Sequence, residues 1–160
     1  MREIRNTTQR LAVLGRPYQV HNGVIYADLA WAAANLVYVP MPQGLVLSWD
    51  HGTITHRVRC HRLLADQLQG AFVELMAKRL WDELGSFAGS YIVRRQRGSK
   101  AISAHAFGIA LDFNSENMPQ GSPAQWPVKV VDVWNAHGFI NGAGFKRPDP
   151  MHWEALKVFP

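Results

Sequence analysis

The chain has 160 residues, which is enough for one domain with its own hydrophobic core. Apolar residues make up 48% of the chain, a share that excludes an intrinsically disordered protein. The 17 Lys and Arg residues outnumber the 12 Asp and Glu residues, and the resulting net charge of +5 favours an anionic partner such as a charged polymer, a membrane surface or a nucleic acid.

Two of these partner classes lack their usual sequence signals. Basic and aromatic residues are not interleaved and no glycine-rich phosphate loop occurs, so we expect no nucleic acid partner. The stretch at 1–8 is polar, and no apolar run reaches the length of a membrane-spanning helix. We therefore expect that the protein is synthesised in the cytoplasm without a signal peptide and that it does not insert stably into a membrane. Cys60 is the single cysteine, and we expect a half-buried structural thiol there.

Residues 1–160 are expected to form one domain, because no internal repeat or linker divides them. Residues 1–44 carry no motif, and we interpret them as an N-terminal embellishment of a core at about residues 45–160. Within the core, the spacing of Leu and Phe predicts one long amphipathic helix over residues 62–84.

A predicted strand follows at residues 108–113, where large apolar residues alternate with small or polar ones. This period of two places one face of the strand in the core and leaves the other face open. Asp112 belongs to the open face. His105 precedes the strand on a predicted turn, and Gly108 lets the backbone pass close to whatever His105 binds.

Three further elements are predicted towards the C-terminus. Residues 118–127 are rich in Pro, Gly, Ser and Gln, so we expect a loop that borders a cleft. A short helix is predicted over residues 126–137. Residues 151–154 again alternate, with His152 on the open face of a second strand. The two strands can therefore present His152 to the same point as the earlier His and Asp.

Two histidines and a carboxylate can hold one divalent metal ion and leave a coordination position for water. Asp149 precedes the last histidine by three residues, within reach of that water, so the residues suit metal-assisted hydrolysis. Glu154 shares a strand face with His152, where it either orients that ligand or remains a solvated carboxylate. The same ligand types also form the facial triad of non-haem Fe(II) oxygenases. In those enzymes the first His and the carboxylate are usually closer in sequence than His105 and Asp112, which six residues separate.

The spacing S-x-H-x-x-G-x-A-x-D at residues 103–112, followed by D-x-x-H at residues 149–152, resembles the signature of a known family. It is similar to the zinc D-Ala-D-Ala carboxypeptidase and L-Ala–D-Glu endopeptidase (LAS-type) family, within the wider group of lysostaphin-type peptidases and Hedgehog domains. A G-x-Y-x-x-R segment at residues 89–94 extends the resemblance, which covers about residues 58–154. It implies an α+β fold in which a small antiparallel sheet carries a zinc site and helices pack on the opposite face.

The resemblance also implies roles for individual residues. His105, Asp112 and His152 would be the ligands of one Zn²⁺ ion. Asp149 would be the general base, and Arg94 would polarise the scissile carbonyl or bind the oxyanion. Three further residues are expected to contact the substrate: Ser103, Arg97 and Tyr91.

The substrate that the resemblance implies is the stem peptide of bacterial peptidoglycan. The family's L-Ala–D-Glu endopeptidases, found in phage lysins, resemble this chain in having Asp rather than Glu at position 149, which favours an endopeptidase. Without an export signal, such an enzyme is expected to be a phage or prophage endolysin that reaches the wall after the membrane is breached. We expect it to be a monomer. One alternative is a D-Ala-D-Ala carboxypeptidase of the same family. More distant alternatives are the Fe(II) oxygenase and a non-catalytic zinc-binding module, although such a module needs neither Asp149 nor Arg94.

Overall fold

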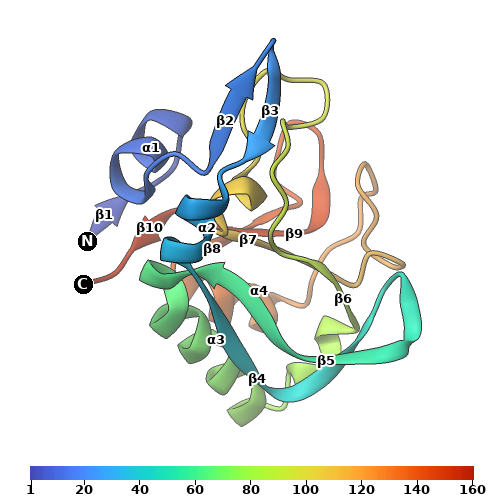
Figure 1. Cartoon of the computed structure of the whole chain (residues 1–160). Helices are drawn as coiled ribbons and strands as arrows, with labels where there is room; N and C mark the ends of the chain where they lie inside the picture. Colours follow the sequence, from blue (N-terminus) through green and yellow to red (C-terminus); the bar gives the residue numbers. More distant parts are fainter.

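A six-stranded sheet lies at the centre of the computed structural model, which describes residues 1–160 (Figure 1). Its strands are β4 (Leu36–Leu47), β5 (Asp50–His61), β6 (Ser86–Gly89), β7 (Ala110–Phe113), β8 (Phe139–Gly142) and β9 (Asp149–Ala155). They lie side by side in the order β5-β4-β6-β7-β9-β8. All neighbours are antiparallel except β4 and β6, which run parallel. The α+β fold class is therefore confirmed, with one parallel pair in an otherwise antiparallel sheet.

Two helices pack against the sheet: α3 (Ala65–Ala77) contacts β4, α4 (Val128–Ala136) contacts β8, and the helices contact each other. The helix α4 confirms the prediction for residues 126–137. The single helix predicted over residues 62–84 is wrong, because it is divided into η1 (Arg62–Leu64), α3 and η2 (Trp81–Leu84). The α3 helix ends where Arg79 adopts a φ of +58° and the N–H of Leu80 donates to the carbonyl of Leu75. This is a Schellman ending, with Arg in the position that Gly usually takes.

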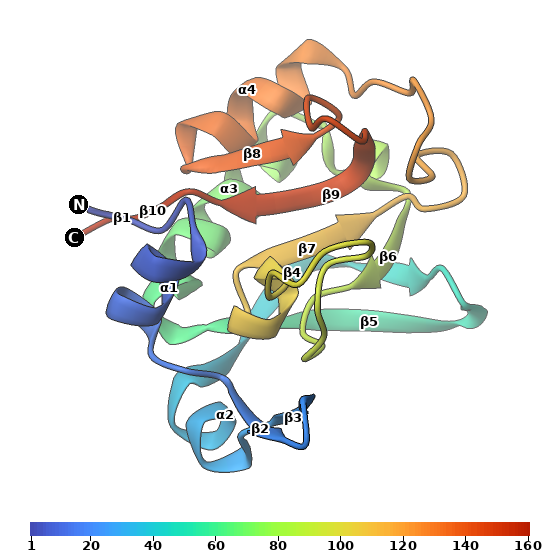
Figure 2. The same cartoon turned by 90° about the horizontal axis from the view of Figure 1, so that it is seen from above.

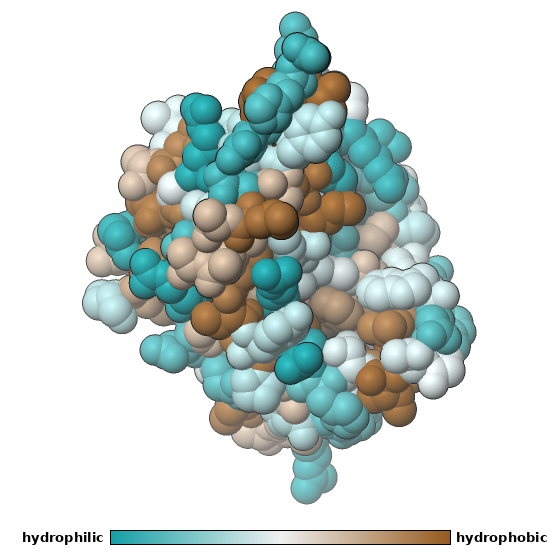
Figure 3. Space-filling view, in the orientation of Figure 1, coloured by the Kyte–Doolittle hydropathy of each residue, from teal (hydrophilic) through white to brown (hydrophobic).

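The N-terminal part packs against this core through Ile4 and Leu14. It comprises β1 (Arg2–Glu3), α1 (Thr7–Leu14), β2 (Tyr18–His21), β3 (Val24–Ala27) and α2 (Leu29–Asn35). The strand β1 pairs with β10 (Lys157–Val158), so the two chain ends lie side by side (Figure 2). The β2–β3 hairpin projects from the body, and its tip is hydrophilic (Figure 3). None of the helices combines the length and the apolar character that a membrane-spanning helix requires.

The first site strand begins at Ala110 rather than Gly108, and Ala110 on its predicted open face is also buried, but the large apolar residues lie in the core as predicted. Ile109, Leu111 and Phe113 are each at most 1% exposed. On the helix side of the sheet, the ring of Trp134 stacks on that of Trp153, with centroids 5.3 Å apart. Ile4 belongs to the same buried cluster, so the N-terminal part and the core share one hydrophobic interior.

Gly108 is expected to stabilise the turn that leads into β7, because other residues would not fit there. Its φ is +67°, and a Cβ there would lie 2.9 Å from the backbone N of His61. Gly108→Ala should therefore lower the free energy of unfolding by about 2–4 kcal/mol, from left-handed strain and overpacking together. The matched control is Gly23→Ala, because Gly23 has a φ of +76° but open space around it, and strain alone costs about 1 kcal/mol. Equal urea midpoints for the two variants would contradict this account.

His61 is expected to make stability depend on pH. It is 1% exposed, its Nδ1 accepts from the N–H of Leu63, and burial together with the charge of Arg62 lowers the pKa of His61 to about 4. At a pH between this value and the unfolded pKa of about 6.5, His61 is protonated in the unfolded chain but remains neutral in the native protein. The free energy of unfolding therefore falls as the pH drops through this range. The wild type should lose about 2 kcal/mol more than His61→Asn between pH 8 and pH 5 in urea unfolding. Parallel pH profiles for the two proteins would disprove the assignment.

Candidate active site

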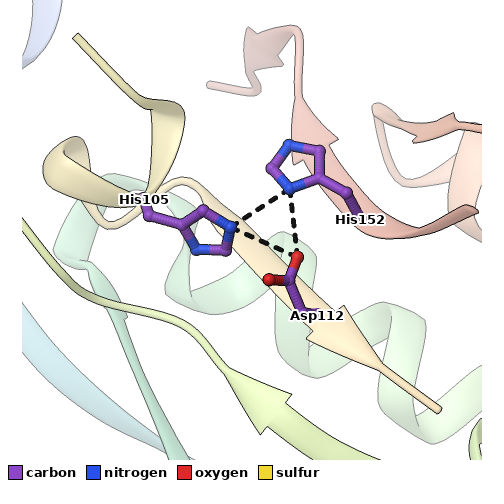
Figure 4. Close-up of side chains that lie close together, drawn as sticks. All are labelled: His105, Asp112 and His152. Carbon is purple, nitrogen blue, oxygen red and sulfur yellow. Dashed lines mark hydrogen bonds and ion pairs between the residues drawn. The ribbon is translucent and has the colours of Figure 1, made fainter. Parts of the chain in front are cut away.

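Three side chains from three elements meet on the open face of the sheet (Figure 4). Asp112 lies on β7, and His152 lies opposite it on β9 in the antiparallel register. His105 comes from the 3₁₀ helix η3 (Ala104–Phe107), which begins where the Oγ of Ser103 accepts from the N–H of His105. Gly108 ends η3 in the left-handed conformation and returns the chain to the sheet. The sequence-predicted ligand residues are thus close neighbours.

Their ligand atoms lie at distances that suit one ion. Nε2 of His105 is 3.1 Å from Nδ1 of His152, and Oδ1 of Asp112 is 3.2 Å and 3.0 Å from these two nitrogens. Tetrahedral zinc with bonds of about 2.0–2.2 Å keeps its ligand atoms about 3.3–3.6 Å apart. The three atoms would need to move only a few tenths of an ångström to share an ion.

The outer hydrogen bonds of both imidazoles favour the same conclusion. Nδ1 of His105 lies 2.6 Å from the carbonyl oxygen of Ser90, which can only accept, so this nitrogen carries the proton. Nε2 of His152 lies 3.1 Å from a carboxylate oxygen of Glu154 and donates to it in the same way. Two imidazole lone pairs and the oxygen of Asp112 are then left facing one another. Such a set of acceptors fits a cation.

The pKa values of Asp112 and His152 also indicate that positive charge is favoured at the centre of the site. Burial would raise the pKa of Asp112, but His105 and His152, when their rings are protonated, donate hydrogen bonds to it and hold its pKa well below the usual range. Burial likewise disfavours the charged form of His152, yet the Asp112 and Glu154 carboxylates raise the pKa of His152 to about 9. Without a metal ion, a proton therefore takes the place of the cation.

Asp149 stands at the start of β9, where it lines the same pocket as His105 and His152. Its Oδ2 accepts from Nε2 of Gln120 at 3.1 Å, while its Oδ1 is buried without a hydrogen-bond partner. Burial raises the pKa of Asp149. A carboxylate with one free oxygen and a raised pKa is suited to exchanging protons. Gln120 was missed from sequence, although it lies in the loop predicted to border the cleft.

Arginines surround this pocket, which has a volume of about 170 Å³. Arg94 and Arg97 line it and also line an adjoining hollow on the other side of His105. Arg147, which was also missed from sequence, lines the pocket and is exposed. The guanidinium of Arg94 donates to the carbonyl of Arg95 and that of Arg97 to the side chain of Gln120. The walls of the cleft therefore carry positive charge from three arginines beside the carboxylates of Asp149 and Glu154.

The remaining predicted substrate contacts also border the cleft. Ser103 lines the pocket and is 4% exposed. Tyr91 lines the adjoining hollow, with its hydroxyl buried and unpaired and its ring 5.2 Å from the guanidinium of Arg59. The exposed Trp49 also lines that hollow. His137 lies away from the site, where its ring bonds to Glu74 of α3.

The fold and this cluster together are those expected of a hydrolase that uses a single metal ion. A family model described as D-alanyl-D-alanine carboxypeptidase matches residues 97–155. The match covers less than half of the chain but includes His105, Asp112, Asp149 and His152, so the chain is similar to this peptidase family over the segment that carries the candidate ligands. Arg94 lies upstream of the matched residues. No curated protein and no solved structure matches the chain.

Proposed function

We propose that the protein is a zinc L-Ala–D-Glu endopeptidase that cleaves peptidoglycan stem peptides as a monomeric endolysin. The observation that supports a hydrolase is the convergence of three ligand atoms within 3.2 Å of one another beside the half-buried carboxylate of Asp149. The finer specificity is supported by Asp149, since Asp at this position resembles the endopeptidase branch. The runner-up is a D-Ala-D-Ala carboxypeptidase, the activity that the description of the matching family names.

The proposed mechanism assigns each step to a residue of this chain. His105, Asp112 and His152 would hold the zinc ion, which when bound supplies a Lewis acid and lowers the pKa of water to about 7. Asp149 accepts a proton from the attacking water through its unpaired Oδ1 and returns it to the leaving amine nitrogen. Arg94 donates hydrogen bonds to the carbonyl oxygen as negative charge develops on it.

Substrate binding would use the charge of the cleft. Arg97 and Arg147 lie on its walls, where they can pair with the carboxylates of a stem peptide. Ser103 lines the pocket and Tyr91 lines the adjoining hollow, and the buried Tyr91 hydroxyl would have to become accessible before it could bind a substrate. This arrangement suits either specificity, because both candidate substrates are anionic stem peptides.

Mass spectrometry of muropeptides after digestion tests the proposal. A new N-terminal D-Glu identifies the endopeptidase, whereas released D-Ala identifies the carboxypeptidase and overturns the finer assignment. Chelation should abolish wall digestion and added Zn²⁺ should restore it. Recovery with Fe²⁺ and 2-oxoglutarate alone would instead revive the oxygenase, and tight zinc binding without any cleavage would favour a non-catalytic module.

A further inference from the structure

A buried arginine from the N-terminal helix reaches the candidate metal centre. Arg10 lies on α1 and is 4% exposed. Its Nη2 donates to Oε1 of Glu154 at 2.9 Å, and its Nε donates to the carbonyl of Ile4 at 3.0 Å. The other oxygen of Glu154 accepts from Nε2 of His152 at 3.1 Å. A continuous chain of hydrogen bonds thus connects α1 to a candidate zinc ligand.

The local fold positions the residues at both ends of this series of hydrogen bonds. His152 and Glu154 are two residues apart on β9, so their side chains share the open face. On the other side, pairing of β1 with β10 and the hydrogen bond from the N–H of Ile4 to the carbonyl of Leu156 hold the N-terminal segment beside the end of β9. Arg10 can therefore reach Glu154 although 144 positions separate them.

Stability alone is a weak reason for such a pair. Taking a guanidinium and a carboxylate out of water is costly, and well-packed apolar side chains of similar volume often serve a fold equally well. The geometry, however, gives the pair a specific task. Glu154 can hold the proton on Nε2 of His152 only while its carboxylate keeps its orientation, and Arg10 holds the oxygen that His152 does not use.

We propose that Arg10 is a positioning residue of the metal centre. It fixes the Glu154 carboxylate, which keeps the proton of His152 on Nε2 and turns the Nδ1 lone pair towards His105 and Asp112. The inference rests on the proposed function in so far as it takes these three residues as the zinc ligands. It makes α1 part of the site, although α1 lies outside the residues that match the family model.

The test is zinc affinity of the full-length protein, measured by competition with a chromophoric chelator. Arg10→Met, which keeps an unbranched apolar stem but removes the guanidinium, should weaken Zn²⁺ binding about 10- to 100-fold, as losses of outer hydrogen-bonding partners do. Arg10→Lys should recover part of this affinity, since Lys keeps the charge but not the two-point geometry. Arg5→Met is the matched control, because Arg5 lies near the same helix with a 58% exposed side chain.

Two further readouts separate positioning from folding. The visible absorption spectrum of the Co²⁺-loaded protein should change in Arg10→Met and not in Arg5→Met, because the spectrum reports ligand geometry. In a Glu154→Gln background, Arg10→Met should cost much less affinity than in the wild type. If Arg10→Met does not fold, the comparison of Arg10→Lys with the wild type carries the same test.

Each outcome bears on one claim. Wild-type zinc affinity and an unchanged Co²⁺ spectrum in Arg10→Met and Arg10→Lys would overturn the role of Arg10, even if their melting temperatures fell. That result would leave the proposed function standing, provided that the wild type binds zinc and cleaves muropeptides. A wild-type protein that fails to bind zinc would overturn both claims.

Discussion

Asp149→Asn is expected to lower the turnover of peptidoglycan stem peptides about 100- to 10,000-fold, the usual contribution of a general base. Asn has nearly the same shape and can keep a hydrogen bond to Gln120, but it cannot take up a proton. Zinc affinity should change little, because Asp149 is not one of the three converging residues. Digestion rates with purified stem peptides, together with the zinc content of the variant, provide the measurement.

The matched control for this prediction is Asp82→Asn, which removes the same charge from an exposed position on η2. This variant should digest stem peptides at the wild-type rate. Full activity in Asp149→Asn would remove Asp149 from the mechanism. Loss of zinc from Asp149→Asn would instead reassign Asp149 to metal binding.

His105→Ala is expected to abolish zinc binding and activity together. The ring of His105 supplies one of three converging ligand atoms, and a site that loses a ligand should lose more affinity than the 10- to 100-fold typical of an outer partner. Because His105 is only 3% exposed, His105→Gln should be prepared as well, since its longer side chain fills more of the space. Zinc content after dialysis and the rate of stem-peptide cleavage are the two measurements.

His56→Ala serves as the control, because His56 is exposed on β5 and lies outside the cluster. It should retain both zinc and activity. A His105→Ala protein that folds, keeps stoichiometric zinc and cleaves its substrate would refute the assigned ligand set.

Local patterns were sufficient to predict the strands that carry the site. The alternation at residues 108–113 depends on which side chains can enter the core, and that choice is made by each residue's own polarity. The prediction for residues 62–84 was wrong for a related reason. Arg79 ends α3 in a left-handed conformation that Arg rarely adopts, and the apolar spacing continues across the break.

By itself, the sequence determined the residue types of the site, their order and the faces of their strands, because these depend on composition and on a period of two. Only the tertiary structure decided that Asp112 lies opposite His152, which nitrogen of each imidazole faces the centre, and that Arg10 reaches Glu154. Those contacts join residues far apart in the chain. They depend on strand pairing and on the path of the backbone, which short-range patterns of polarity do not encode.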